Sequence, residues 1–199
     1  MRKILAVATM AAALGMGEAA LAEGSVEAGQ QKSAVCAACH GPDGNSFNPE
    51  WPSLAGQHAP YLATQLEAFR EGRRENPLMS PMAMGLSDED ILDLAAFYSA
   101  QSPAALEADP ALVERGRRLY KGGDLERGVS ACIACHGPTG RGNPMAGYPV
   151  VAGQHAAYTR MTLLDYAAGN RRNLMMQEIA ARMTGEDKEA VAAYLQGLR

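Results

Sequence analysis

Apolar residues recur at helical spacing in several segments of the chain, and no stretch alternates convincingly between apolar and polar positions as a β-strand does. Over residues 61–71, Leu62, Leu66 and Phe69 fall on one face of a helix, and Gly72 marks its end. The pattern therefore predicts an all-α protein whose helices are joined by long loops.

Capping residues mark where further helices begin. Ser87 precedes three acidic residues, which is typical of an N-cap followed by a first turn that favours negative charge. The apolar positions of the helix that follows are Ile91, Leu94, Ala95 and Tyr98. Ser25 is a suitable N-cap for a helix near the start, and Asp109 before Pro110 predicts another N-terminus.

The chain contains an internal repeat. The segments CAACHGPDGN, LAGQHAPY and LSDEDI reappear as CIACHGPTGR, VAGQHAAY and MTGEDK. The offset is 96 residues between His40 and His136 and 97 residues from Gly56 and Gly153 onward, and an insertion at 121–129 gives a smaller offset further upstream.

Two small domains follow from this repeat. The sequence predicts domain 1 over residues 23–101, a linker over 102–110 that contains two prolines, and domain 2 over 111–199. Domains of this size hold only a marginal hydrophobic core, and aromatic residues make up only 6% of the chain. We therefore expect another component to fill the middle of each domain.

The first 22 residues have the pattern of a secretory signal peptide. Arg2 and Lys3 precede an apolar stretch from Ile4 to Leu14, and Ala20-Leu21-Ala22 fits a cleavage site. This apolar stretch is too short to span a membrane. Residues 1–22 are therefore expected to direct the chain to the periplasm.

The overall charge excludes one class of function. The formal net charge is −4, whereas a general nucleic-acid binder has a basic excess, so we expect no nucleic-acid partner. Residues 23–101 have a net charge of −7 and residues 102–199, the linker included, a net charge of +2. This difference predicts a charge dipole along the two-domain axis that steers partners of opposite charge to opposite ends.

All four cysteines lie in two copies of Cys-x-x-Cys-His, the attachment signature of c-type haem. These residues are Cys36, Cys39 and His40, and Cys132, Cys135 and His136. The spacing brings two thiols to the two haem vinyl groups and directs the histidine at the iron. The sequence thus predicts two covalently bound haem c groups.

Three other interpretations of the cysteines fit less well. Two disulfides would suit a secreted protein but leave the repeated histidine unexplained. A zinc site would have to combine cysteine pairs from different repeats. A thioredoxin-like redox pair would need a strand–helix setting that the sequence does not indicate.

The repeat also selects a second axial ligand for each iron. Met79 aligns with Met176, whereas Met82 and Met84 align with residues other than methionine. We therefore expect His/Met ligation by His40 with Met79 and by His136 with Met176. His58 and His155 are also paired at offset 97, so bis-His ligation is the alternative.

Other repeated residues have expected roles around the haem. The backbone carbonyls of Pro52 and Pro149 are placed to accept a hydrogen bond from the proximal histidine ring. Candidate partners for the haem propionates are Tyr61, Tyr158, Arg73, Arg74, Arg171 and Arg172. Solvated surface positions are the equally open interpretation for the arginines.

From residue 23 to the end, the chain resembles the cytochrome c4 family, in which two class I cytochrome c domains are fused. The resemblance implies thioether bonds at the four cysteines, proximal ligands His40 and His136, and distal ligands Met79 and Met176. It also implies that the first and last helices of each domain cross at Gly29 and Gly116, against Phe97 and Tyr194 respectively.

The resemblance implies a one-electron carrier, not an enzyme, in a respiratory chain. Its expected partners are a quinol-oxidising cytochrome complex and a haem–copper terminal oxidase, and peripheral association with a membrane is compatible with this role. The alternative is a dihaem subunit that accepts electrons in a flavocytochrome sulfide dehydrogenase, with a flavoprotein subunit as partner. A dihaem peroxidase is disfavoured because it needs one open iron, whereas both expected sites are closed.

Overall fold

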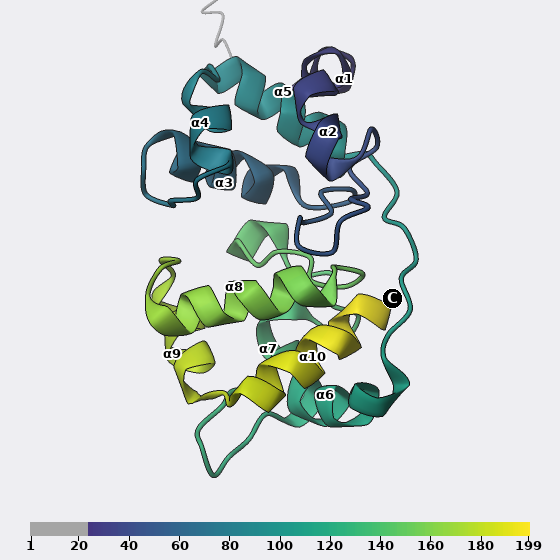
Figure 1. Ribbon diagram of the computed structural model, residues 1–199, viewed down its shortest axis with the longest axis vertical. Coiled ribbons are helices and arrows are strands. Elements are labelled where there is room, and N and C mark those ends of the chain that lie inside the picture. The colour runs from purple at the N-terminus through teal and green to yellow at the C-terminus, as the bar shows by residue number, and fades with distance from the viewer. Residues whose placement is uncertain (1–23) are drawn as a thin grey trace, which may run out of the picture.

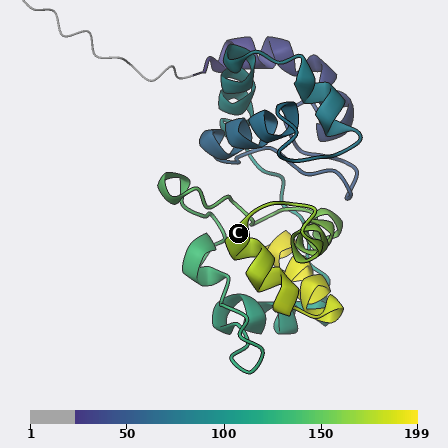
Figure 2. The same cartoon turned by 90° about the vertical axis from the view of Figure 1, so that its left-hand side faces the viewer.

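The computed structural model describes residues 24–199, and the expected signal peptide at 1–22 lies outside the described residues. Two helical units are stacked along the long axis of the molecule, and an extended segment joins them along one side (Figure 1). The view turned by 90° shows the same separation into two units (Figure 2).

The N-terminal unit is built from short helices around one pair of longer ones. Its elements are α1 (Val26–Lys32), η1 (Ser33–Val35), α2 (Ala37–His40), α3 (Ala59–Arg70), α4 (Met79–Met84) and α5 (Asp88–Ser99). Helix α5 packs against both α1 and α3, and α4 packs against α3. The core between them includes Leu62, Ile91, Leu94 and Phe97.

The C-terminal unit repeats this arrangement. Its elements are α6 (Pro110–Gly122), α7 (Ile133–His136), η2 (Pro144–Ala146), α8 (Ala156–Ala168), α9 (Leu174–Arg182) and α10 (Gly185–Gly197). Helix α10 packs against α6 and α8, and α9 packs against α8. Over residues 24–199 no strand is present, only isolated bridges between Asp124 and Val129 and between Asn143 and Tyr148, so the all-α prediction is confirmed.

The predicted helix caps are present. Ser25 accepts a hydrogen bond from the backbone N–H of Ala28, and Asp109 caps α6 with Pro110 at its first position. Ser87 and Thr184 each form a capping box with an aspartate three residues later, at the starts of α5 and α10.

Each unit brings its first and last helices together at a glycine, as the resemblance implies. A Cβ on Gly29 would lie 2.0 Å from the Asp93 carbonyl oxygen, and one on Gly116 would lie 2.1 Å from that of Ala190. Both distances are far below van der Waals contact, so only glycine allows the helices to pack this closely. Phe97 and Tyr194 flank the two crossings with their Cβ atoms.

The linker between the units is held at both ends. Asn45 accepts a hydrogen bond from the Ala104 N–H at 2.7 Å, which attaches the linker to the N-terminal unit. Gln196 and Arg199 donate to the carbonyl oxygens of Glu107 and Leu106, which attaches it to the C-terminal unit. Among the described helices, none has the length and apolarity needed to cross a membrane.

Candidate functional site

Each Cys-x-x-Cys-His motif forms a single helical turn, in α2 and in α7. The backbone N–H of His40 donates to the Cys36 carbonyl at 2.9 Å, and His136 makes the same bond to Cys132. This turn gathers the two thiols and the imidazole of each motif in one place. Gly41 ends the first turn with a φ of 80°, a backbone conformation that favours glycine.

Both motif histidines are oriented by a proline carbonyl, as predicted. His40 Nδ1 lies 2.8 Å from the Pro52 carbonyl oxygen, and His136 Nδ1 lies 3.0 Å from that of Pro149. Nδ1 is therefore the protonated nitrogen of a neutral ring, and Nε2 is left for a metal. Burial lowers the pKa of both histidines, which favours the neutral form that binds metal.

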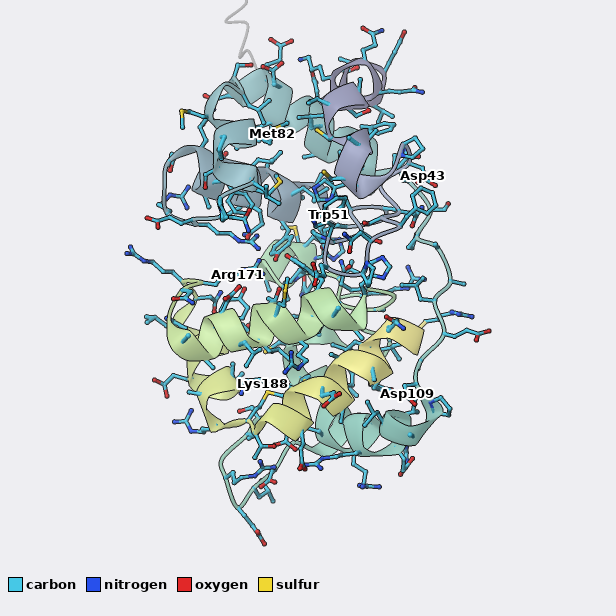
Figure 3. All side chains as sticks on the ribbon, viewed as in Figure 1. Asp43, Trp51, Met82, Asp109, Arg171 and Lys188 are labelled. Atoms are coloured by element: carbon cyan, nitrogen blue, oxygen red, sulfur yellow. The ribbon has the colours of Figure 1, made fainter. Side chains whose placement is uncertain are left out.

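The paired methionines occupy equivalent positions in the two units. Met79 begins α4 and Met176 lies in the first turn of α9, and both are half-buried. Met84 is 69% exposed and Met82 46% exposed, and Figure 3 labels Met82 within the N-terminal unit, away from the interface. Burial thus separates Met79 from Met82 and Met84, the other two methionines of its helix.

The repeated histidines that follow Ala-Gly-Gln lie between the two units. His58 Nε2 lies 2.8 Å from the Arg141 carbonyl oxygen, and His155 Nε2 lies 2.8 Å from that of Ser46. Each histidine thus forms a hydrogen bond with the backbone of the other unit. These hydrogen bonds occupy Nε2, the nitrogen through which each histidine would bind iron in bis-His ligation.

A buried cationic cluster lies at the same interface. Arg171 is only 6% exposed, and its hydrogen bonds go to the Tyr61 hydroxyl at 2.6 Å and to Gln65 Oε1 at 2.9 Å. Arg74 likewise donates to Gln65 and to the Tyr158 hydroxyl. Figure 3 shows Arg171 between the two units. All of these partners are neutral.

A buried positive charge without an acidic partner is costly, so this cluster calls for an anion. Burial raises the pKa of Tyr158, but the charges of Arg171 and Arg74 outweigh burial and lower it to about 8. The other two predicted arginines lie elsewhere: Arg73 pairs with Glu71 on the surface, and Arg172 is exposed.

The residues in each unit fit a covalently attached haem. The four cysteines are free, so thiols are available for thioether bonds. The Tyr98 hydroxyl is buried without a hydrogen-bond partner, as expected where a group is still to be accommodated. The cationic cluster suits carboxylates such as haem propionates.

The disulfide and zinc interpretations of the cysteines have no support in this geometry. The two cysteine pairs lie in different units, and within residues 24–199 no group of three or more His, Cys, Asp or Glu residues is placed to hold a metal ion. The motifs act separately, one in each unit.

Two pairs of residues with structural roles in the site were not identified from the sequence. Asn76 and Asn173 hold the starts of α4 and α9 through their side-chain oxygens. Gln57 and Gln154 form hydrogen bonds across the interface. Each pair recurs at the offset of 97 residues, and this recurrence is the sequence feature that could have identified them. The positions show neither helical periodicity nor a known motif.

Comparison with known proteins places the chain in a family. The cytochrome c family model matches residues 26–100 and again 113–199. Cytochrome c4 of Stutzerimonas stutzeri is 45% identical over 198 residues, covering 93% of this chain and 94% of the relative. A thiosulfate dehydrogenase electron acceptor of Thiomonas intermedia is 39% identical, covering 98% of this chain and 90% of the relative.

A solved structure agrees with this assignment. The crystal structure of reduced recombinant cytochrome c4 from Pseudomonas stutzeri matches with a TM-score of 0.86 at 45% identity, covering 88% of this chain and all of that one. The two family matches, one in each unit, imply two covalently bound haem c groups at the Cys-x-x-Cys-His motifs. The chain therefore belongs to the cytochrome c4 family of dihaem electron-transfer proteins.

Proposed function

We propose that this protein carries electrons one at a time in a respiratory chain, from a quinol-oxidising cytochrome complex to a terminal oxidase. The observation that carries the proposal is that each unit holds a Cys-x-x-Cys-His turn whose histidine keeps Nε2 free, together with a half-buried methionine that we propose as the second axial ligand. A closed six-coordinate iron favours electron transfer over oxygen or peroxide chemistry. The haem groups supply the one-electron iron chemistry, and the chain supplies attachment, ligation and orientation.

The proposed site is the same in both domains, with boundaries at 23–101 and 111–199. Thioether bonds form at the four motif cysteines, Cys36, Cys39, Cys132 and Cys135. The axial ligands are His40 with Met79 and His136 with Met176. The bonds from Nδ1 to Pro52 and Pro149 support this assignment because they leave Nε2 of each histidine for iron.

The interface cluster supports a path between the two haems. Arg74 and Arg171 lie between the units and have only neutral partners among the described residues. Propionates from haems on both sides would supply the missing negative charge. Because arginines of both units meet there, we propose that electrons pass between the haems at this interface.

The proposed compartment is the periplasm. The basis is the signal-like sequence at 1–22. Peripheral membrane association is compatible with both proposed partners, which are membrane complexes.

A sulfur-compound dehydrogenase is the second candidate electron donor. One relative is named as a thiosulfate dehydrogenase electron acceptor. This makes thiosulfate the substrate to test beside sulfide, which the flavocytochrome alternative requires together with a flavoprotein partner.

The test is reduction of the purified oxidised protein by each donor, followed at the haem absorption bands. Membranes that contain the quinol-oxidising complex should reduce both haems when quinol is added, and membranes that contain the terminal oxidase should then reoxidise them with oxygen uptake. Rapid reduction by a purified thiosulfate dehydrogenase, without reduction by the quinol-oxidising complex, would favour the second candidate. Failure of both donors would contradict the carrier proposal.

A further inference from the structure

The peptide group that orients each proximal histidine is also held by a glutamine from the other unit. The peptide between Pro52 and Ser53 accepts from His40 Nδ1 through its C=O at 2.8 Å. The N–H of the same peptide donates to Gln154 Oε1 at 3.0 Å. One amide therefore links the His40 ring to Gln154, which lies 101 positions after Ser53, in the C-terminal unit.

The second unit contains the mirror arrangement. The C=O of the peptide between Pro149 and Val150 accepts from His136 Nδ1 at 3.0 Å. Its N–H donates to Gln57 Oε1 at 2.9 Å, and Gln57 lies in the N-terminal unit. The two connections thus run in opposite directions across the interface.

Each glutamine is fixed by further hydrogen bonds. Gln57 Nε2 donates to the Val150 carbonyl at 2.8 Å, and Gln57 Oε1 also accepts from the backbone N–H of His58 at 3.0 Å. Gln154 makes the corresponding bonds to Ser53 and His155 at 2.9 and 3.0 Å. Because each oxygen faces two N–H donors, the orientation of both amides is determined by the network.

Hydrogen bonds in such a chain reinforce one another. When the N–H of a peptide donates, electron density moves toward its carbonyl oxygen, which becomes a stronger acceptor. A stronger acceptor on Nδ1–H makes the imidazole a more basic ligand, and more basic ligation stabilises the oxidised iron. Each glutamine therefore lowers the reduction potential of the haem on the other side of the interface.

We propose that Gln57 and Gln154 are positioning residues that tune the proximal ligand across the domain interface, Gln57 acting on His136 and Gln154 acting on His40. Docking of the two units and the potentials of the two haems are then linked through two peptide groups. The inference rests on the proposed histidine ligands, and for each of them it adds a glutamine that changes the basicity of the ligand.

The test uses Gln57→Leu, which removes the acceptor and donor with little change in size. The haem of the C-terminal unit should rise in potential more than the haem of the N-terminal unit, in an NMR-monitored redox titration that resolves the two haems. The Nδ1 proton of His136 in the reduced protein should move upfield because its hydrogen bond weakens. Gln154→Leu should produce the mirror result, on the N-terminal haem and His40.

His58→Gln is the matched control. It breaks the neighbouring interdomain bond to Arg141 but leaves the Pro149–Val150 peptide and Gln57 intact. Both potentials and both Nδ1 proton shifts should stay at their wild-type values. A shift as large as that of Gln57→Leu would mean that general loosening of the interface is responsible, and would overturn the proposal.

Other outcomes also decide the matter. The proposal fails if Gln57→Leu shifts mainly the haem of its own unit, shifts both equally, or leaves the His136 Nδ1 proton unmoved. If the leucine variants do not fold, Gln57→Glu and Gln154→Glu keep an acceptor, and the opposite haem should then fall in potential. Ring-current shifts of the His40 and His136 ring protons in the wild type report ligation itself, so failure of the ligand assignment is seen separately.

Discussion

Asn76 and Met79 are joined by a hydrogen bond of 2.9 Å from the methionine backbone N–H to the asparagine side-chain oxygen, and Asn173 and Met176 repeat it at 3.0 Å. Asn173 is the N-cap of α9, whereas Asn76 lies two residues before Leu78, the N-cap of α4, and both side chains hold the backbone of the residue three positions later. The same asparagine–methionine hydrogen bond in both units gives the two methionines equivalent backbone placement.

We predict that Met79→Ala opens one iron per chain to carbon monoxide, because alanine cannot ligate. The potential of that haem should fall, since thioether ligation favours the reduced state, while the other haem stays near its original value. Carbon monoxide difference spectra and a redox titration measure both effects. Met82→Ala is the control and should leave both spectra unchanged. An unaltered spectrum for Met79→Ala would assign the ligand elsewhere.

Haem attachment gives a second prediction. Acid–acetone extraction of the wild type should leave two haems per chain with the protein, because both are held by thioether bonds. Cys39→Ser should lose holoprotein in the N-terminal unit, with one haem remaining in the C-terminal unit, and Cys135→Ser should do the reverse. A pyridine haemochrome assay counts the haems. Pigment passing into the acetone layer from the wild type would contradict covalent attachment.

The helix start at α10 provides a test of stability. Thr184 is the N-cap of this helix and Asp187 completes its capping box. The Asp187 side chain is 3% exposed and pairs with Arg115 at 2.9 Å and with Arg127. Both arginines are partly exposed, at 42% and 35%, so removing the charge of Asp187 leaves no fully buried cation and costs less than breaking a fully buried pair. Asp187→Asn should therefore lower the unfolding free energy of the C-terminal unit by about 1–2 kcal/mol at pH 7, measured by calorimetry. Asp90→Asn, at the equivalent and more exposed position, should cost less.

The same carboxylate predicts a pH dependence. Burial would raise the pKa of Asp187, but hydrogen bonds from Arg127, the Thr184 backbone and Arg115 outweigh it and hold the pKa well below its usual range. A lowered folded pKa contributes stability above the unfolded value of about 4 and loses it as the pH falls toward the folded value. The stability difference between wild type and Asp187→Asn should therefore shrink below pH ~4. A difference that stays constant with pH would rule out the ionised pair as its source.

Charge steering gives a prediction about partners. Residues 23–101 hold 11 acidic and four basic residues, and residues 102–199, which include the linker, hold ten acidic and 12 basic residues. Stopped-flow electron transfer with a small basic and a small acidic redox protein should slow for both as salt rises from about 0.01 to 0.1 M, because the Debye length falls from about 30 to about 10 Å. Charge reversal in the N-terminal domain should affect only the basic partner. Salt-independent rates for both partners would contradict the dipole.

Much of the fold was predictable from local signals. Ser87, Thr184 and Asp109 mark helix starts through side chains that act on their own backbone, so the sequence contains the whole interaction. Helix α4 was not predicted because it is short and contains Pro81, which is unfavourable within a helix. Its N-cap is Leu78, whose side chain cannot accept a hydrogen bond, so no capping residue marks the start of α4 in the sequence.

The interface was not predictable, for a different reason. Gln57 and His58 recur as Gln154 and His155, but their partners are backbone atoms of the other unit. Backbone atoms leave no trace in the sequence, because every residue has them. The repeat therefore shows that these side chains recur in both halves, but it does not show that each side chain forms its hydrogen bonds with the other half.

The linker, which is fastened to one unit by Asn45 and to the other by Gln196, sets the effective concentration of each unit at the surface of the other. A short tether gives a value that is roughly millimolar. Polar contacts such as those of Gln57 and Gln154 are then enough to keep the units together, although the same contacts would leave separate chains apart at low protein concentration. An interface of this kind can be polar and still be permanently formed, because covalent continuity replaces the large apolar area that two free subunits would need.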